Sequence, residues 1–273
     1  MISAVCWGAG DFGGGLASRR APVFGVVLIS QIVGMAIAVV LAVGLGETLP
    51  SPTDIAWAIA AGIAGGIGIA SLYRALAVGR MGIVAPITGV LSAVIPVGLG
   101  FVLEGVPPPP VLLGVGLAIA AVVLVSRVED EEASSGPQGF GLALAAGIGF
   151  GLFGACIAQV GEGRVFGPLA VVRATEAVLI SGIILVTRAG WRPPRDLVPG
   201  IVGVGVLDMA GNGAYIVAIQ AGSLAVASVL SALYPVATVV LAALILRERM
   251  TRDHAMGIVL AFTAIALIAA GSA

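Results

Sequence analysis

Five ionisable side chains lie inside long apolar stretches of this sequence: Asp11, Arg74, Arg173, Glu176 and Asp208. An ionisable group at the centre of a bilayer costs about 3 kcal/mol on insertion scales, so such residues are candidates for function. Buried carboxylates and guanidinium groups in membranes bind polar solutes or relay protons. We therefore treat Asp11, Asp208 and Glu176 as candidates for proton coupling.

The strongest cluster is Asp208, Asn212 and Tyr215, which follow one another at i, i+4 and i+7. On an α-helix these positions share one face, so a carboxylate, an amide and a phenol can face one cavity. We predict that this face contacts a solute. The alternative is a stripe of hydrogen bonds to neighbouring helices, a common use of Asn in membranes.

Trp7 and Asp11 share a face of the first apolar stretch, and we predict that they line the same site. Because this stretch is short, Asp11 can instead lie near the wet headgroups. Arg173 and Glu176 are three residues apart and can neutralise each other on one helix face. That pair is either an internal structural pair or a binding site for an anionic solute.

Three further residues complete the predicted substrate site. Gln31 occupies the position in the first half of the chain that Arg173 occupies in the second, and Tyr73 corresponds to Tyr215 in the same way. Tyr234 precedes Pro235 and is a plausible wall residue. Pro86, Pro96 and Pro235 are expected to interrupt the fourth and ninth helices and to free carbonyl groups, although kinking without ligand contact is the alternative.

The composition determines the class of protein that must position these residues. The 273 residues are 59% hydrophobic and 10% charged, with a mean hydropathy of +1.16. A soluble domain cannot hide that much apolar surface, and each spanning helix needs roughly 20 apolar residues. We predict an all-α membrane protein with ten transmembrane helices. The predicted spans are 2–18, 24–46, 55–78, 82–104, 111–126, 139–160, 166–188, 197–220, 222–246 and 254–272.

Two similar halves are recognisable along the chain. Leu91 to Val97 resembles Leu230 to Val236, and four further matches occur in the same order in both halves. We divide the chain into a first five-helix repeat, 1–126, an acidic polar linker, 127–138, and a second five-helix repeat, 139–273. An odd number of helices per repeat inverts the second repeat in the membrane, an arrangement characteristic of secondary transporters.

The repeats resemble the EamA-type members of the drug/metabolite transporter superfamily. The residues that carry the resemblance are Trp7-Gly8 and Phe12, Pro168 with Arg173, Tyr215 with Ala218, the stretch from Ser231 to Val236, and Arg247 to Thr251 with Gly257. The resemblance implies ten helices, no ATP hydrolysis, and transport, often export, of small polar molecules through a central cavity. The first repeat departs from the pattern at Gln31 and Pro86.

Several classes of function find no support in the sequence. There is no basic stripe for nucleic acid, no G-x-x-x-x-G-K-[ST] phosphate loop and no H-E-x-x-H motif, and His254 is the single histidine. Cys6 and Cys156 lie in apolar stretches. We therefore expect no nucleic-acid partner, no cofactor, no metal and no enzyme activity. An intramembrane enzyme is a poor alternative, because Asp11 and Asp208 lie in non-equivalent helices.

The leading hypothesis is a gradient-driven transporter of a small polar metabolite in the cell membrane, such as an amino-acid or metabolite exporter, working by alternating access. The main alternative is a structural or assembly membrane protein without transport. A monomer is the expected state. Ten loop arginines fall on one side of the ten-helix topology against Arg164 on the other, which places both termini outside by the positive-inside rule. The family resemblance implies both termini inside.

Overall fold

A computed structural model describes the backbone of residues 1–78, 81–125, 137–245 and 252–271. All regular structure within these ranges is helical, as expected where no water is available to pair an exposed backbone. The helices are α1 (Ile2–Ser18), α2 (Val23–Gly44), α3 (Pro52–Val78), α4 (Met81–Leu103), α5 (Pro109–Val125), α6 (Pro137–Ile157), α7 (Phe166–Thr187), the 3-10 helix η1 (Arg195–Leu197), α8 (Val198–Ala221), α9 (Leu224–Ser231), α10 (Tyr234–Ile245) and α11 (Arg252–Gly271).

Nine of the ten predicted spans correspond to single α-helices whose ends differ from the prediction by three residues at most. The predicted span 222–246 is divided into α9 and α10. Most of the predicted linker, 127–136, lies outside the described residues. The prediction of an all-helical protein with ten apolar segments is therefore confirmed.

Proline has opposite consequences in the two helices where we expected breaks. The ninth span is interrupted at Ala232 and Leu233, within the turn before Pro235, which has no N–H to donate to that turn. The predicted interruption of the fourth helix is wrong. The helix α4 continues through Pro86 and Pro96, because each proline removes a single hydrogen bond and the turns on either side keep theirs.

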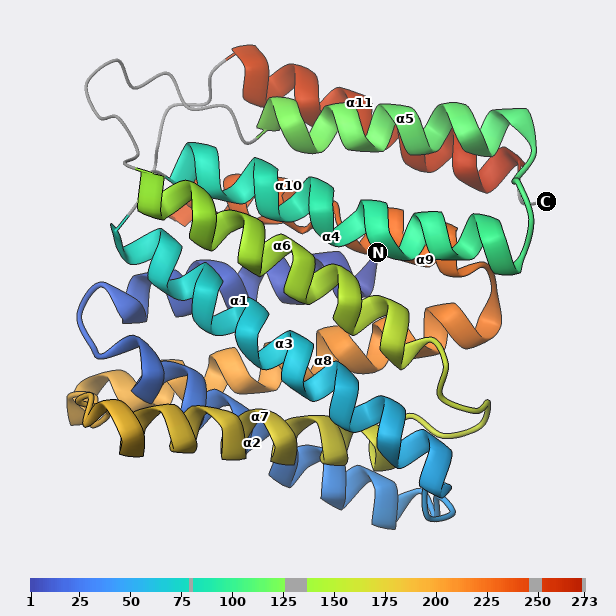
Figure 1. The fold of residues 1–273 in the computed structure, drawn as a ribbon. Helices are drawn as coiled ribbons and strands as arrows, with labels where there is room; N and C mark the ends of the chain where they lie inside the picture. Colours follow the sequence, from blue (N-terminus) through green and yellow to red (C-terminus); the bar gives the residue numbers. More distant parts are fainter. Residues whose placement is uncertain (79–80, 126–136, 246–251, 272–273) are drawn as a thin grey trace.

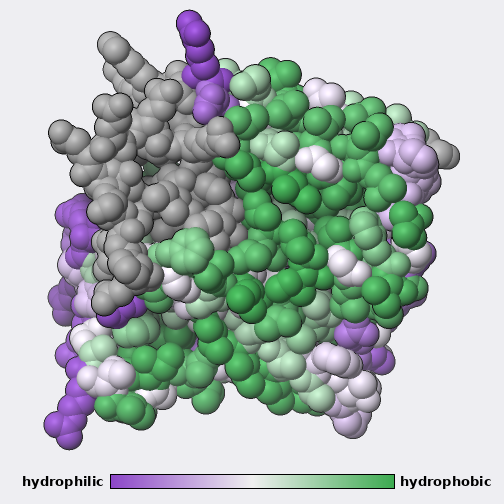
Figure 2. Space-filling model, turned by 45° about the horizontal axis from the view of Figure 1, so that its top comes forward, coloured by the Kyte–Doolittle hydropathy of each residue, from purple (hydrophilic) through white to green (hydrophobic). Residues whose placement is uncertain are grey.

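The outer surface shows whether water or lipid surrounds this fold. Five described helices are long and apolar enough to cross a membrane, and four shorter apolar helices accompany them. Figure 2 shows an apolar band across one face of the molecule, with hydrophilic residues gathered at its two ends. Such a band matches the hydrocarbon layer of a bilayer. The chain is a multi-pass membrane protein.

The helices run along one common direction, and their connections lie at two opposite ends (Figure 1). One end, which we call the arginine-rich face, consists of the connections 19–22 and 188–197 and the start of α11. The arginines at these positions are Arg19, Arg20, Arg188, Arg192, Arg195 and Arg252. The opposite end, the arginine-poor face, consists of the connections 45–51, 104–108, 158–165 and 222–223. Helices α5 and α11 pack against each other at one edge of the bundle, and the remaining helices form its body.

Small residues bring helices α3 and α6 into direct backbone contact. A Cβ atom added at Gly149 would lie 2.7 Å from the carbonyl oxygen of Ala64 and 2.8 Å from the Cα of Gly68. Backbone atoms cannot turn away as a side chain can, so the two helices would have to separate. Close approach through small residues is the main means by which membrane helices associate.

We therefore expect Gly149→Ala to destabilise the fold by about 1–3 kcal/mol, the usual cost of overpacking. Thermal unfolding of the purified protein in detergent measures this loss. The matched control is Gly141→Ala on the same helix, where an added Cβ meets nothing within 4 Å. Equal melting temperatures for the two variants would contradict the close contact of α3 with α6.

Candidate functional site

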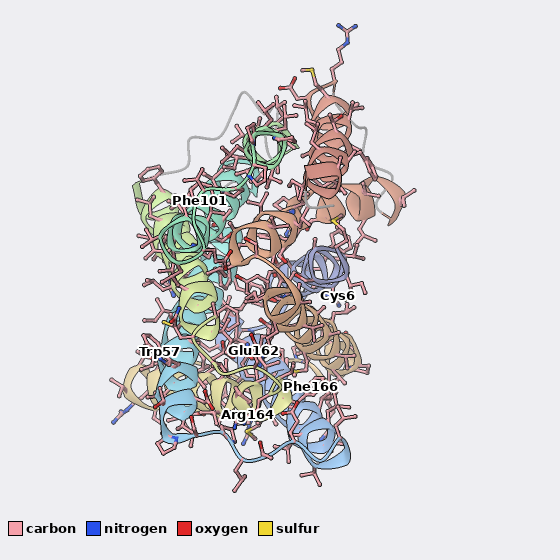
Figure 3. The ribbon with its side chains drawn as sticks, turned by 90° about the vertical axis from the view of Figure 1, so that its right-hand side faces the viewer. Cys6, Trp57, Phe101, Glu162, Arg164 and Phe166 are labelled. Atoms are coloured by element: carbon pink, nitrogen blue, oxygen red, sulfur yellow. The ribbon has the colours of Figure 1, made fainter. Side chains whose placement is uncertain are left out.

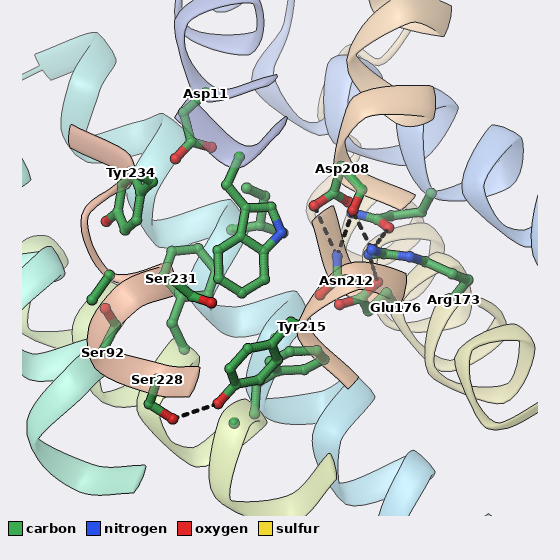
Figure 4. Close-up of a pocket in the computed structure, with 18 residues that line it drawn as sticks. Asp11, Ser92, Arg173, Glu176, Asp208, Asn212, Tyr215, Ser228, Ser231 and Tyr234 are labelled. Atoms are coloured by element: carbon green, nitrogen blue, oxygen red, sulfur yellow. Dashed lines mark hydrogen bonds and ion pairs between the residues drawn. The ribbon is translucent and has the colours of Figure 1, made fainter. Parts of the chain in front are cut away.

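A cavity lined by both apolar surface and ionisable side chains lies in the body of the bundle, with an empty volume of about 700 Å³ when its open mouth is included. Every helix except the α5–α11 pair and the short η1 contributes to its described lining. The lining residues are Trp7, Asp11, Gln31, Gly65, Ile69, Ser92, Phe150, Phe153, Gly154, Arg173, Glu176, Asp208, Asn212, Tyr215, Ser228, Ser231, Ala232 and Tyr234 (Figure 4).

A buried charge cluster occupies one side of this cavity, centred on the guanidinium of Arg173. Its Nη1 donates to Glu176 Oε2 at 2.7 Å and to Gln31 Oε1 at 2.5 Å. Its Nη2 lies 2.9 Å from Asp208 Oδ2, an ion contact without good hydrogen-bond geometry. Arg173 is 2% exposed and Glu176 is 3% exposed. The predicted neutralisation of Arg173 by Glu176 is therefore confirmed, and Asp208 is a second anionic partner.

The predicted face of Asp208, Asn212 and Tyr215 is presented to the cavity by α8. Asn212 Nδ2 donates to the backbone carbonyl of Asp208 at 2.8 Å and to its carboxylate at 3.1 Å. The hydroxyl of Tyr215 lies 2.8 Å from Ser228 Oγ on α9. Asn212 thus holds the Asp208 carboxylate in place, and Tyr215 links α8 to the interrupted ninth span.

Asp11 and Tyr234 face another part of the cavity wall, on α1 and α10 (Figure 4). Among the described residues Asp11 has neither a hydrogen bond nor an ion pair through its carboxylate. The hydroxyl of Tyr234 is buried and also lacks a hydrogen-bond partner in the described part of the chain. Trp7 lies one turn before Asp11, and its ring centroid is 5.4 Å from that of Tyr215. The structure thus gathers Trp7, Asp11 and Tyr234 in one cavity with the Arg173 cluster.

Tyr73 is the predicted site residue that does not line the cavity. It is buried in the helix packing, with its hydroxyl over Gly14 of α1, where an added Cβ would lie 2.1 Å from the hydroxyl oxygen. Tyr215 makes the corresponding contact with α6, where a Cβ at Gly154 would lie 2.7 Å from its hydroxyl. The two tyrosines occupy similar packing positions, but Tyr215 lines the cavity and Tyr73 does not.

Several lining residues were not predicted, among them Ser92, Phe150, Phe153, Ser228 and Ser231. A signal for two of them was present, because Ser92 and Ser231 are the equivalent serines of the repeated stretches in the fourth and ninth spans. The sequence contains no signal for Phe150 and Phe153, since an aromatic residue in an apolar helix normally contacts lipid or packs against a neighbouring helix. Within the described residues, no three His, Cys, Asp or Glu side chains are grouped as a metal site requires.

A second set of polar contacts closes the arginine-poor face, and we call it the carboxylate clamp: Glu47, Asp54 and Glu104. The carboxylate of Glu47 accepts from the backbone N–H groups of Val165, Phe166 and Gly167 at 2.7–3.0 Å. These groups open α7, and a negative charge at a helix N-terminus is stabilising.

The other two members of the carboxylate clamp are built in the same way. Asp54 accepts from Arg164 Nη1 at 2.8 Å and from the Gly161 N–H at 2.9 Å. Glu104 accepts from the Leu224 N–H at 2.9 Å, at the start of α9. Figure 3 looks onto this face and shows Arg164 on the connection between α6 and α7. All three acids come from residues 1–126, and all of these partners come from 139–273.

The fold and the cavity define a helical multi-pass membrane protein with ionisable side chains facing a cavity inside its helix bundle. The model of the EamA-like transporter family matches residues 137–270. This match places the protein in the drug/metabolite transporter superfamily. Members of the family are membrane transporters.

The fold is shared with a solved structure. A solved structure titled "Crystal structure of protein" superposes with a TM-score of 0.77 at 16% identity, and the match covers 98% of both chains. At that identity the likeness shows a shared fold. No curated protein sequence matches the chain significantly.

Proposed function

We propose that this protein is a secondary transporter that moves a small polar metabolite across the cell membrane by alternating access. The observation that carries the proposal is the cavity itself, which gathers four ionisable side chains, Asp11, Arg173, Glu176 and Asp208, inside a bundle of apolar helices. Such groups are costly in a membrane and mark solute or proton pathways. The family assignment supports transport, and export is the direction that the resemblance favours.

Alternating access requires two parts that move against each other, and we assign these parts to 1–126 and 139–273 as inverted repeats. Pairs of equivalent helices support the assignment: α1 packs on α8 and α6 packs on α3, while α2 packs on α8 and α7 packs on α3. The equivalent residues Gln31 and Arg173 touch each other, as expected beside a twofold axis. The equivalent tyrosines Tyr73 and Tyr215 each place a hydroxyl group beside a glycine of the equivalent helices α1 and α6, although the two glycines, Gly14 and Gly154, differ by one position in the alignment.

The carboxylate clamp supplies the closed side of such a cycle. Its hydrogen bonds join the first repeat to the second on the arginine-poor face, so they must break for the cavity to open there. We assign the energy source of the cycle to an ion or solute gradient. If the ion is a proton, the carboxylates of Asp11, Asp208 and Glu176 are the candidate groups that bind it. The cavity, the two repeats and the clamp together account for a transport cycle in which one face opens while the other stays closed.

Purified protein in proteoliposomes tests the proposal directly. Vesicles preloaded with each member of a panel of small polar metabolites are expected to accumulate the matching labelled solute by counterflow for at least one member, and protein-free vesicles are not. Counterflow needs no knowledge of the coupling ion. Failure of every solute across a broad panel, with protein shown to be folded and inserted, would count against transport.

Asp208→Asn is expected to reduce the counterflow rate at least about tenfold. This reduction corresponds to an increase of about 1.4 kcal/mol or more in the activation free energy of transport. The amide keeps the shape of the side chain but removes the charge that faces Arg173 in the cavity. Asp196→Asn is the matched control, since its side chain is 64% exposed on the arginine-rich face. An unchanged rate for Asp208→Asn would remove this residue from the mechanism.

A further inference from the structure

The connection between α7 and α8, residues 188–197, presents positive charge outside the cavity. It contains Arg188, Arg192 and Arg195, and its single acid, Asp196, pairs with Arg20. No acid in the described part of the chain forms an ion pair with any of these three arginines. All three side chains are exposed, and none of them lines the cavity. Their charge is therefore available to a partner outside the protein.

This connection is held firmly on the arginine-rich face (Figure 1). The carbonyl oxygen of Trp191 lies so close to Gly25 of α2 that an added Cβ at Gly25 would overlap it. Pro193 and Pro194 fix their own backbone φ angles. The guanidinium carbon of Arg192 lies 5.4 Å from the centroid of the Trp191 ring, where a cation and an aromatic ring attract each other. The arginines therefore stand on a supported segment.

The neighbours of the connection give its level in the bilayer. Trp191 is 41% exposed, and a partly exposed Trp at the end of a membrane helix is typical of the headgroup region. Leu185 and Val186, in the last turn of α7, are 77% and 85% exposed, as expected of side chains that contact acyl chains. Arg188 follows within one turn. Its long side chain therefore reaches the level of the lipid phosphates.

An open strip on α7 leads from the acyl-chain region toward Arg188. Val178, Gly182 and Leu185 follow one another at i, i+4 and i+7, so they share one face of the helix. Val178 is 73% exposed, and an added Cβ at Gly182 would meet nothing within 4 Å. The glycine thus leaves a shallow gap between two outward-facing apolar side chains. An acyl chain matches the chemistry of this strip, which ends beside an arginine.

The backbone of Arg188 is a separate indication that its side chain has a role. Among the described residues it is the one non-glycine with a positive φ, 53°, and it ends α7. Helices that end in this left-handed conformation usually have Gly there, because a Cβ is unfavourable. A residue kept in a strained conformation points to a function of its side chain. A cation also stabilises a helix C-terminus, so an experiment must separate the two roles.

We propose that this part of the arginine-rich face binds an anionic phospholipid. The phosphate-bearing headgroup contacts Arg188 and Arg192, and one acyl chain lies along Val178, Gly182 and Leu185. Guanidinium groups bind phosphate oxygens through paired, charge-assisted hydrogen bonds. Each basic residue near an anionic lipid surface increases the affinity roughly fivefold. This site is separate from the cavity and does not depend on the proposed transport function.

The test uses two phospholipids with identical acyl chains, phosphatidylglycerol and phosphatidylcholine. Their binding to the delipidated full-length protein in detergent is measured by native mass spectrometry. We expect phosphatidylglycerol to bind at least about tenfold more tightly, because it carries a net negative charge that two arginines attract. Glycerophosphoglycerol, the same headgroup without acyl chains, is expected to bind at least about tenfold more weakly than the whole lipid, because it lacks the apolar contact.

Single substitutions locate the site. Arg192→Gln is expected to reduce the preference for phosphatidylglycerol roughly fivefold. The matched control is Arg252→Gln, which removes an exposed arginine of the same face at the start of α11 and should leave the preference unchanged. Arg188→Gly should also reduce the preference roughly fivefold, with a melting temperature at or above that of the wild type, because Gly suits the left-handed backbone. A lower melting temperature with the preference intact would assign Arg188 to the helix terminus alone and overturn its role in the site.

The remaining outcomes are decisive as well. Equal binding of the two phospholipids by the wild type would overturn the proposal. So would a preference that survives in Arg188→Gly combined with Arg192→Gln. Binding of glycerophosphoglycerol as tightly as the whole lipid would assign the arginines to a soluble anion and overturn the lipid site. Because these measurements need no transport, a failure of counterflow leaves the lipid site standing, and loss of the lipid site leaves the proposed transporter standing.

Discussion

Replacing Arg173 with Met is expected to lower the melting temperature of the protein in detergent by about 10 °C and to abolish counterflow. The guanidinium is buried and faces Glu176 and Asp208 at ion-pair distance. Its removal leaves two carboxyls in a site with little water, and removing one partner of a buried ion pair costs about 3–5 kcal/mol. A loss of 1 kcal/mol lowers the melting temperature by roughly 2–4 °C in a chain of about this length.

The matched control is Arg20→Met, which removes an arginine from an ion pair on the arginine-rich face. The side chains of Arg20 and Asp196 are 70% and 64% exposed and 3.5 Å apart. Exposed pairs of this kind contribute at most about 1 kcal/mol, so we expect a small shift.

A charge-neutral version of the cluster separates stability from transport. Arg173→Met combined with Glu176→Gln and Asp208→Asn removes all three charges, and such replacements of buried ion pairs are often neutral for stability. We expect this triple variant to recover most of the lost melting temperature and to remain inactive. If Arg173→Met alone melts at the wild-type temperature, then the two acids do not carry charge in the folded protein.

The sequence predicted one contact of this cluster and could not predict the others. The spacing of Arg173 and Glu176 on α7 identifies their contact, because residues three apart meet on any α-helix. The approach of Asp208 depends on where α8 passes α7, which no local pattern specifies. The contact of Arg173 with Gln31 was not predicted, because the sequence comparison identifies the two residues as equivalent positions and does not place them next to each other.

Two differences between prediction and structure have equally local causes. Tyr73 was assigned to the site by its equivalence to Tyr215, but it does not line the described cavity, because its ring packs over Gly14. The break in the fourth helix was expected because proline lacks an N–H, but the neighbouring hydrogen bonds preserve α4. Helix ends were predicted well, since the alternation of apolar runs with Gly, Pro and charged residues marks them clearly.

The carboxylate clamp was missed because acids in loops are ordinary in a sequence. Glu47, Asp54 and Glu104 flank apolar stretches, where charged residues usually contact water or headgroups. Only the structure shows that they bind the beginnings of α7 and α9 and the connection before α7. Sequence analysis gives the composition of a loop, whereas the partner of each loop depends on the tertiary arrangement.

Weakening the carboxylate clamp is expected to open the cavity toward the arginine-poor face. In Glu47→Gln combined with Asp54→Asn, each amide presents one acceptor and one donor group. Glu47 accepts from three backbone N–H groups, and Asp54 accepts from Arg164 and Gly161. At each of the two substituted positions, at least one N–H that the carboxylate had accepted must then face the NH2 group of the new amide. Hydrogen bonds to charged groups contribute about 1.5–3 kcal/mol each, so the closed state loses at least about 2 kcal/mol.

A cysteine in the cavity reports the change. With Cys6 and Cys156 replaced by Ala, Ser92→Cys provides a single thiol in the lining, and a charged thiol reagent that does not cross the membrane labels it from one side at a time. We expect the double clamp substitution to raise the labelling rate from the arginine-poor side at least about tenfold, because 1.4 kcal/mol changes an equilibrium by this factor. Labelling from the arginine-rich side is expected to slow as the population shifts.

The sidedness of the assay is established within the same background. Glu162→Cys places a thiol on the exposed connection between α6 and α7, so the side from which it is labelled is the arginine-poor side. This control also decides between the positive-inside rule and the family resemblance on the orientation of the protein. If the double substitution leaves both labelling rates unchanged, the clamp does not hold the two repeats together on that face.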